Sequence, residues 1–446
     1  MKKINYFIVI IMLLAPFTAC NEDLVTGNLE NESDEHSEQK EIVTSENANI
    51  TLDVARKIAM DFMQENSNSE LRSGKDNEIQ KTECIIEDND TLMYLVNFGE
   101  GFTLVSGSSV IYPILGFADQ NNLYEDDINN NPDLSFWFEY VKGQIKETLN
   151  DTIFEYYDPL GWEDITDYSA TRSSGVGESG RQSGRVGEEL CLIKTNWHQG
   201  PPFNNTAPYV GSNYSNGNAP AGCVAIAIGQ ILFYHKQMSG YSYDWNKLAY
   251  PSTYPTEIAN FIKSIGSGVS MVYNKDGSHP KILTKLDMYP GPKDFFERVG
   301  YKVKSSSFSL TEIAYQLDRK NPVYISGYKD SDFLNAPNLF KGHAWVCDAY
   351  VKRTLEYNRN GRSSGGGGRS SGRSGTRASS DNTVYVYYLH FNWGWGGSHN
   401  GWFADGKNRW AYDYPPGRND NSPESTDPMY SNRYPRLLKT LSVEKK

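Results

Sequence analysis

The stretch Asn218-Ala219-Pro220-Ala221-Gly222-Cys223-Val224-Ala225-Ile226-Ala227-Ile228-Gly229-Gln230 begins with residues that interrupt regular secondary structure. It then continues into a long apolar run. Proline and glycine interrupt the chain before Cys223, and the residues from Val224 to His235 suit a buried helix. Cys223 is therefore predicted at a helix N-terminus, where unpaired amide N–H groups and the helix dipole favour a thiolate. The usual alternative is a buried structural cysteine, but the small residues before it leave room for a substrate backbone.

A nucleophilic thiolate needs a base, and the chain has seven histidines. His343 follows Gly342 at the start of a predicted strand, so its ring can face a cleft. His390 is the rival, although its place inside a predicted strand is typical of a core histidine. His235 lies twelve residues after Cys223, which is about 18 Å along a helix, so the two cannot pair.

Further polar groups could complete such a site. Asn392-Trp393-Gly394-Trp395-Gly396-Gly397 follows the strand of His390. The Asn392 amide oxygen can accept an imidazole N–H, and the Trp393 indole can shield the ring from water. Upstream, the side-chain amide of Gln199 is a suitable donor to an oxyanion.

Composition limits the class of protein. The chain has 446 residues, which suggests two or three domains. A hydrophobic content of 38% with 13% aromatic residues excludes wholesale disorder. The mean hydropathy of −0.59 excludes a multi-span membrane protein. A net charge of −12 argues against nucleic-acid binding.

The charge is divided unevenly along the chain. Residues 21–170 carry 33 acidic and 8 basic side chains, a net charge of −25. Residues 171–446 carry 22 acidic and 33 basic side chains, a net charge of +11. We therefore expect an acidic half and a basic half that attract each other.

The N-terminus has the pattern of an export signal. Two lysines precede an apolar run from Tyr6 to Phe17, which is shorter than the ~20 residues of a spanning helix. We predict a lipoprotein signal peptide over 1–19 and lipidation of Cys20, with ordinary cleavage as the alternative. Residues 20–48 then form a disordered acidic tether. The expected location is the bacterial outer membrane or cell surface through a lipid anchor, with release after processing left open.

The acidic half is predicted to form a small α+β domain over 49–168. A helix begins at Thr51 and places Val54, Ile58 and Phe62 at intervals of four. A second helix fits 134–149. Strand-like runs lie between them at Cys84–Ile86, Thr91–Phe98, Phe102–Val105 and Val110–Leu115.

Two tracts rich in Gly, Ser and Arg separate the remaining elements. Residues 172–185 read RSSGVGESGRQSGR, which predicts an exposed, cleavable linker over 169–187. Residues 359–380 have a similar composition and are interpreted as a flexible insertion between two strand-like runs, 344–351 and 383–391. A second domain is expected over 188–446.

Apart from Cys20 the chain has four cysteines, Cys84, Cys191, Cys223 and Cys347. Their spacing fits no disulfide scaffold, and a bridge between Cys191 and Cys347 is left open. The sequence shows no metal-ligand cluster of recognisable spacing and no phosphate-binding loop, so we expect no cofactor and no metal.

These residues together resemble a known family. Gln, Cys, His and Asn-Trp occur in the chain order of papain-like cysteine peptidases, and the local strings are most similar to the streptopain and interpain branch. The acidic half resembles that branch's pro-domain at Tyr94–Gly107 and Pro113–Phe117. The matching strings of the second half are Trp197-His198-Gln199-Gly200, Ala221-Gly222-Cys223-Val224-Ala225, Gly342-His343-Ala344-Trp345-Val346 and Asn392-Trp393-Gly394-Trp395-Gly396-Gly397.

The resemblance implies an α+β, papain-like domain of two subdomains, a helical part with the cysteine and an antiparallel β part with the histidine and asparagine. Cys223 would attack the scissile carbonyl of a polypeptide, and His343 would transfer the proton. Gln199 and the Cys223 backbone N–H would hold the oxyanion, while Asn392 orients and Trp393 shields the imidazole.

The resemblance also implies a zymogen, in which the acidic pro-domain is an intramolecular inhibitor that covers the cleft until it is cut off. Gly222 and Gly342 are weaker candidates for substrate contact. Met271-Val272-Tyr273 departs from the family pattern, which puts substrate contacts there in doubt.

Two other functions are weighed against a peptidase. A catalytically retired surface lipoprotein that binds proteins is disfavoured because Gln199, Cys223, His343 and Asn392 are all present. An amide transferase could use the same cysteine and histidine, but nothing in the sequence selects an amine acceptor.

Overall fold

The computed structural model describes the residues 49–66, 78–109, 111–149, 190–281, 291–328, 342–356, 383–404 and 438–446. All of them fall in one unit, Ile42–Lys446. The predicted signal peptide, tether, linker and insertion lie outside the described residues, so their boundaries stay predictions.

The acidic half forms helices packed on four antiparallel strands. Three of the predicted runs coincide with strands, whereas the run 110–115 overlaps the fourth strand only at Ile114 and Leu115. Thr51 caps the first helix, because its hydroxyl accepts the Val54 N–H at 3.4 Å. Its elements are α1 (Leu52–Asn66), β1 (Ile79–Glu87), β2 (Asp90–Phe98), β3 (Phe102–Ser106), β4 (Ile114–Ala118), α2 (Glu125–Asn130) and α3 (Pro132–Leu149).

One detail of the predicted α1 face is wrong. Val54 is 43% exposed, whereas Ala55, Ile58 and Phe62 are buried. A spacing of four drifts away from the 3.6-residue helical repeat, so Ala55 replaces Val54 on the inner face.

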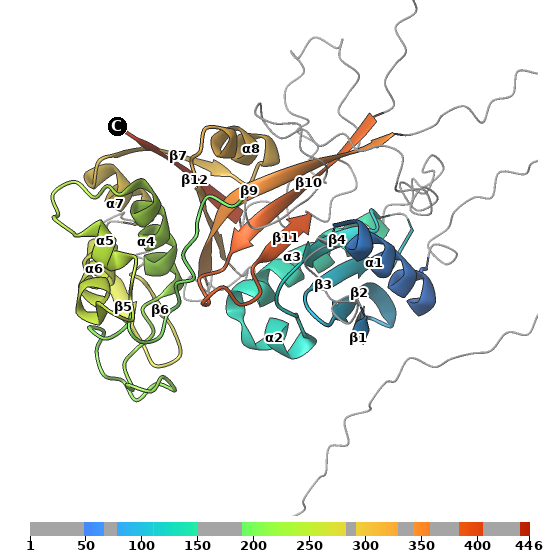
Figure 1. The fold of residues 1–446 in the computed structure, drawn as a ribbon, viewed down its shortest axis with the longest axis horizontal. Coiled ribbons are helices and arrows are strands. Elements are labelled where there is room, and N and C mark those ends of the chain that lie inside the picture. Colours follow the sequence, from blue (N-terminus) through green and yellow to red (C-terminus); the bar gives the residue numbers. More distant parts are fainter. Residues whose placement is uncertain are drawn as a thin grey trace, which may run out of the picture. The chain divides into compact units, whose positions relative to one another are not determined.

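The second half places helices beside antiparallel strands. In Figure 1, α4 to α7 gather near β7 and β12. The helices are α4 (Cys223–His235), α5 (Trp245–Leu248), α6 (Pro255–Gly268), α7 (Pro292–Arg298) and α8 (Leu310–Asp318). The strands are β5 (Met271–Tyr273), β6 (Ser278–Pro280), β7 (Tyr301–Ser307), β8 (Val323–Tyr328), β9 (Gly342–Glu356), β10 (Thr383–Asn392), β11 (Gly401–Ala404) and β12 (Leu438–Lys445).

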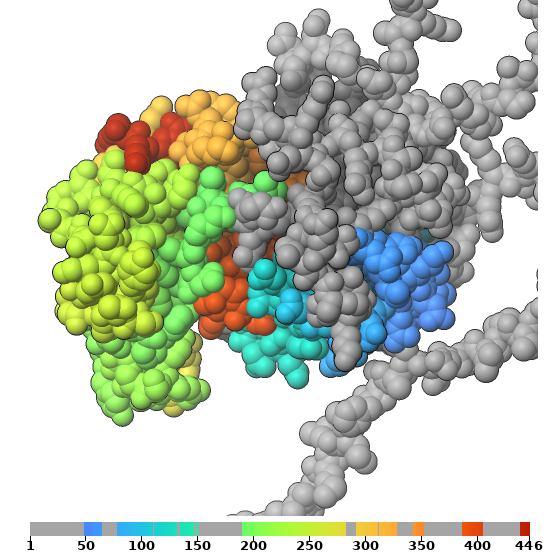
Figure 2. Space-filling view, viewed as in Figure 1, coloured from blue at the N-terminus to red at the C-terminus, as the bar shows by residue number. Residues whose placement is uncertain are grey.

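One antiparallel sheet runs through both halves, in the order β1-β2-β3-β4-β11-β10-β9-β8-β12-β7. The two halves meet where β4 pairs with β11, with Trp402 opposite Phe117 and Phe403 opposite Gly116. Figure 2 shows the cyan surface of the acidic half touching the orange-red surface near β11. The fold is therefore a mixed α+β arrangement that includes the N-terminal region.

Strand β9 is buried on both faces, and this positions the candidate site. Ala344 and Val346 pack in the same apolar cluster as Cys223 and the rest of α4. Trp345 and Cys347 face the other way, into a cluster that includes α3 of the acidic half. Among the described residues, no helix is long and apolar enough to span a bilayer.

Candidate active site

Cys223 is the first residue of α4, as the sequence predicts. The Ile226 N–H donates to the Gly222 carbonyl at 3.1 Å, which starts the helix directly at the cysteine. The Cys223 side chain is a free thiol with 8% exposure. The N-terminal end of α4 favours negative charge on the sulfur, because amide N–H groups there point out of the helix.

The turn before Cys223 is held from two sides. The Ala221 N–H donates to the Gln199 carbonyl at 2.9 Å, which brings the loop of Gln199 to the cysteine turn. The Ser278 hydroxyl donates to the Pro220 carbonyl at 2.6 Å. Gly222 has φ +92°, and a Cβ there would lie 3.0 Å from the Met271 Cε. The structure therefore places Gln199, which is buried, and Gly222 beside the predicted nucleophile.

The loop from Asn392 to Gly397 reaches the same region, since the Gly396 N–H donates to the Trp197 carbonyl at 3.0 Å. The Asn392 amide oxygen accepts from the Gln230 side chain and the Gly394 N–H, both at 3.2 Å. Its amide nitrogen donates to the Thr195 carbonyl. These bonds fix the loop to α4, and the orientation of His343 by Asn392 stays a prediction.

Trp393 is fully buried rather than open to a cleft. Its indole N–H donates to the His399 carbonyl at 2.9 Å, and its ring lies 5.2 Å from that of Trp345. Trp345 and His343 share one face of β9, because side chains alternate along a strand. Trp393 therefore packs on the strand that carries the histidine, while the shielding of the imidazole stays a prediction.

His343 is half-buried near the start of β9, where it is paired with Gly327 of β8. Gly342 begins the strand and is half-buried as well. Phe136 of α3 packs over this pair, since a Cβ on Gly327 would fall 2.2 Å from the Phe136 ring. The acidic half therefore occupies the strand face that carries His343.

The predicted nucleophile and base lie on adjoining elements, α4 and β9, which pack together. The residues of α4, including Cys223, belong to the same apolar cluster as Ala344 and Val346 of β9. His343 lies on the same face of β9 as Trp345, which is the face toward α3 and opposite to that of Ala344 and Val346. Helix α4 thus packs on one face of β9 while His343 lies on the other, and direct pairing of Cys223 with His343 stays a prediction.

A cysteine and a histidine do come together elsewhere, which the sequence did not reveal. The Cys191 Sγ, an Asp348 carboxylate oxygen and a His390 ring nitrogen all lie within 4.8 Å of one another. His390 is buried, as expected for a core histidine, and its Nδ1 lies 2.6 Å from the Asp348 Oδ1. The sequence shows no ligand spacing that would indicate this cluster, because its residues are distant from one another along the chain.

The cysteines differ in what they can do. None of Cys84, Cys191, Cys223 and Cys347 forms a disulfide in this structure, so Cys191 and Cys347 are not bridged. Burial, together with the charge of Asp348, raises the pKa of the Cys347 thiol well above its usual range. Cys347 is therefore unsuited to act as a thiolate at neutral pH.

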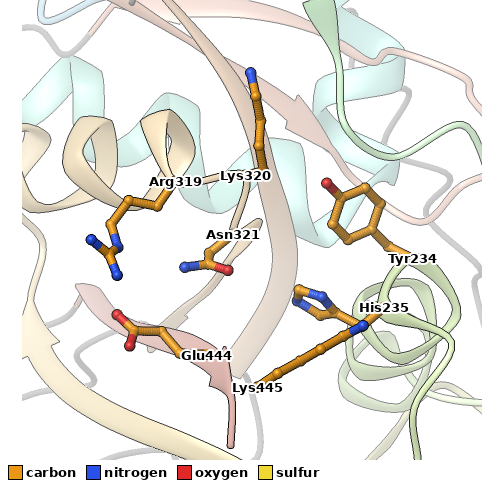
Figure 3. Close-up of a pocket in the computed structure, with 7 residues that line it drawn as sticks. All are labelled: Tyr234, His235, Arg319, Lys320, Asn321, Glu444 and Lys445. Atoms are coloured by element: carbon orange, nitrogen blue, oxygen red, sulfur yellow. The ribbon is translucent and has the colours of Figure 1, made fainter.

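A pocket of about 560 Å³ lies at the opposite end of α4 from Cys223 (Figure 3). It is lined by Tyr234, His235, Arg319, Lys320, Asn321, Glu444 and Lys445. Burial, helped by the charge of Lys445, lowers the pKa of His235 to about 4. The pocket contains no nucleophile paired with this neutral histidine, so it is not the candidate active site.

Comparisons with known proteins agree with this division of the chain. Residues 197–403 match the Peptidase C10 family, and residues 47–145 match the Spi protease inhibitor. The thiol protease/hemagglutinin PrtT of Porphyromonas gingivalis is 25% identical over 357 residues, 71% of this chain and 34% of that protein. The chain thus spans about a third of the length of this relative.

Two solved structures are also similar to this chain. A prointerpain A fragment of Prevotella intermedia has a TM-score of 0.45 at 15% identity and covers 81% of this chain and 97% of its own. Active interpain A of the same organism has a TM-score of 0.32 at 16% identity, with 56% and 92% covered. From these matches, the chain carries a region similar to the peptidase C10 family of cysteine-type peptidases, with a Spi inhibitor-like region ahead of it.

Proposed function

We propose that this chain is a cysteine endopeptidase made as a zymogen, with Cys223 as its nucleophile and His343 as its base. One observation carries the assignment. Cys223 begins α4 inside the matched peptidase region, whereas Cys191 precedes that region. Cys347 also lies inside the region, but it is fully buried and its pKa is raised.

The proposed reaction uses an acyl-enzyme. The Cys223 sulfur attacks the scissile carbonyl, and the oxyanion that forms accepts hydrogen bonds from the Cys223 backbone N–H and the Gln199 amide. His343, which has taken the thiol proton, gives it to the leaving amine. Water then attacks the thioester, again with His343 as base, and releases the second peptide.

Latency follows from the packing of the inhibitor-like region. Phe136 and the rest of the α3 cluster cover the β9 face that carries His343. Removal of residues before the peptidase region would free this face and let the imidazole reach Cys223. The proposal includes the papain-like division into a helical part with Cys223 and a β part with His343.

The proposal extends to location through Cys20. Its expected lipid would tether an exported enzyme to the membrane. Growth with a radioactive fatty acid should label the full chain but not a Cys20→Ser variant. Equal labelling of both chains would refute the anchor without touching the peptidase assignment.

The peptidase assignment is tested with the purified full chain. We expect self-cleavage and casein hydrolysis, both blocked by a thiol-directed epoxide. Cys223→Ala should stay intact and lose at least about a thousandfold in activity. Cys84→Ala is a matched control that should keep activity. Activity that survives Cys223→Ala but is lost in Cys191→Ala would move the nucleophile to the buried cluster. Epoxide labelling without hydrolysis would favour a protein-binding function.

A further inference from the structure

The cluster of Cys191, Asp348 and His390 has no part in the proposed reaction. Its members come from the segment before α4, from β9 and from β10, and their ligand atoms lie within 4.8 Å of one another. Their exposed fractions are 5%, 0% and 5%. Three buried groups with metal-binding atoms have therefore converged from separate parts of the chain.

The backbone is shaped to present Asp348. The register between β9 and β10 shifts between His390 and Phe391, which leaves Asp348 as the extra residue of a β-bulge. A bulge redirects the side chain of its extra residue. Asp348 thereby turns toward His390, and its Oδ1 accepts the Nδ1–H at 2.6 Å.

The segment that carries Cys191 is held on this bulge. The Leu192 N–H donates to the Asp348 carbonyl at 3.0 Å. The Ile193 N–H donates to the Asp348 Oδ2 at 2.9 Å. These two bonds fix both the carboxylate and the chain beside Cys191, so the three side chains are preorganised around one point.

The ligand types select the metal. Thiolate, imidazole and carboxylate are the groups that bind Zn²⁺, whereas Mg²⁺ and Ca²⁺ prefer oxygen ligands alone. We propose that Cys191, Asp348 and His390 bind one Zn²⁺ ion, which fastens the start of the peptidase region to the sheet.

Metal binding requires a small and definable rearrangement. In a tetrahedral site the ligand atoms lie about 2.0–2.3 Å from the zinc ion and therefore about 3.3–3.7 Å from one another. The His390 Nδ1 and the Asp348 Oδ1, which are 2.6 Å apart, would therefore separate by about 1 Å. Zinc takes the place of the proton between the His390 Nδ1 and the Asp348 Oδ1. That proton moves to the Nε2 of the same imidazole ring. The Cys191 thiol proton is released to water, so binding weakens as pH falls.

Packing indicates when the ion would enter. Cys191 lies in the same apolar cluster as Phe62 and Phe117 of the inhibitor-like region. The His390 ring is covered by Trp402 at 5.1 Å. The site is therefore closed in the intact chain, and zinc would bind during folding and exchange slowly.

The test uses full-length Cys223→Ala protein, which cannot process itself and lacks the proposed catalytic thiol. Refolded with zinc and desalted, it should retain about one Zn²⁺ per chain. Refolded with Co²⁺, it should show a thiolate-to-cobalt charge-transfer band. A further Cys191→Ser change should abolish the band and the bound zinc, while Cys84→Ser should keep both. Asp348→Asn should weaken zinc affinity by about tenfold or more.

Absence of the cobalt–thiolate band from the folded Cys223→Ala protein would overturn the proposal, whatever the variants do. Zinc retained after Cys191→Ser would overturn it too, because the ion would then lie elsewhere. These readouts are independent of peptidase activity, so failure here leaves the assignment of Cys223 and His343 intact.

Discussion

At the scale of single residues, Gly222 has two reasons to be glycine. Its φ of +92° disfavours any side chain, and a Cβ would lie 3.0 Å from both the Met271 Cε and the Ser278 carbonyl. Gly222→Ala should lower the free energy of unfolding by about 2–4 kcal/mol, since strain and overpacking add. It should also lower activity by displacing Cys223.

A second glycine, compared by urea unfolding, separates the effect of backbone strain from the effect of overpacking. Gly240 has φ +83° with nothing within 4 Å of an added Cβ. Gly240→Ala should therefore cost only about 1–2 kcal/mol of strain and leave activity unchanged. Equal losses of stability and activity in both variants would show that crowding at Gly222 is unimportant.

His235 should make stability depend on pH. Its pKa is lowered from 6.5 to about 4, and its buried Nε2 has no hydrogen-bond partner among the described residues. Above pH 6.5 the ring is neutral in both states. As pH falls toward 4 only the unfolded chain takes up the proton, so the free energy of unfolding falls by about 2 kcal/mol at pH 5.

Urea unfolding of the Cys223→Ala protein at pH 7 and pH 5 measures this effect. His235→Gln should reduce the difference between the two pH values by about 2 kcal/mol. Tyr234→Phe, a neighbouring change in the same pocket, should keep the full difference. An unchanged pH dependence in His235→Gln would rule out His235 as its source.

At the scale of elements, α3 should control latency through Phe136. The Phe136 ring lies against Gly327, the strand partner of His343, and 6.1 Å from Trp345. Phe136→Ala should cost about 3–5 kcal/mol of stability. It should also speed epoxide labelling of Cys223 in the unprocessed chain by about tenfold or more, because the β9 face is uncovered.

Phe62→Ala is the matched control for this loss of a buried ring. Phe62 is also buried, but it packs from α1 against Phe117 at 4.8 Å, away from β8. Phe62→Ala should lose about as much stability as Phe136→Ala. It should change the initial rate of epoxide labelling of Cys223 much less. Equal acceleration in the two variants would mean that loosening of the whole inhibitor-like region, rather than α3, releases the site.

Local patterns predicted the elements that carry the chemistry. The break before Cys223 and the apolar run after it gave α4, and alternating apolar runs gave β9 and β10. The bulge at Asp348 was not predictable, because it depends on the register between two strands far apart in sequence. For the same reason Cys191 could not be matched with His390 from spacing alone.

At the scale of the whole molecule, the pairing of β4 with β11 joins two regions that the sequence treats as separate domains. Short strands show their own pattern but not their partner, since pairing is decided by tertiary packing. The described residues of both regions thus share a sheet and apolar clusters. Their separation in the active enzyme requires breaking those contacts.

The opposite charges of the two halves predicted that they attract each other, and salt would screen such an attraction. The described contact is instead largely apolar, with Trp137 4.9 Å from Phe391 and Phe117 stacked 6.3 Å from Trp402. The His399 Nε2 and the Asp127 Oδ1 also lie 4.0 Å apart across it. Exposed charges are screened by salt, whereas apolar contacts and strand pairing are not.

We therefore expect latency to withstand salt. Epoxide labelling of Cys223 in the unprocessed chain should change less than about twofold between 0.05 and 1 M NaCl, since screening removes only surface attraction. Low urea should accelerate labelling, because it weakens apolar contacts. The processed enzyme, measured alongside, corrects for effects of salt on the chemistry. A rise of tenfold or more in 1 M NaCl, seen only in the unprocessed chain, would restore charge as the main attachment between the halves.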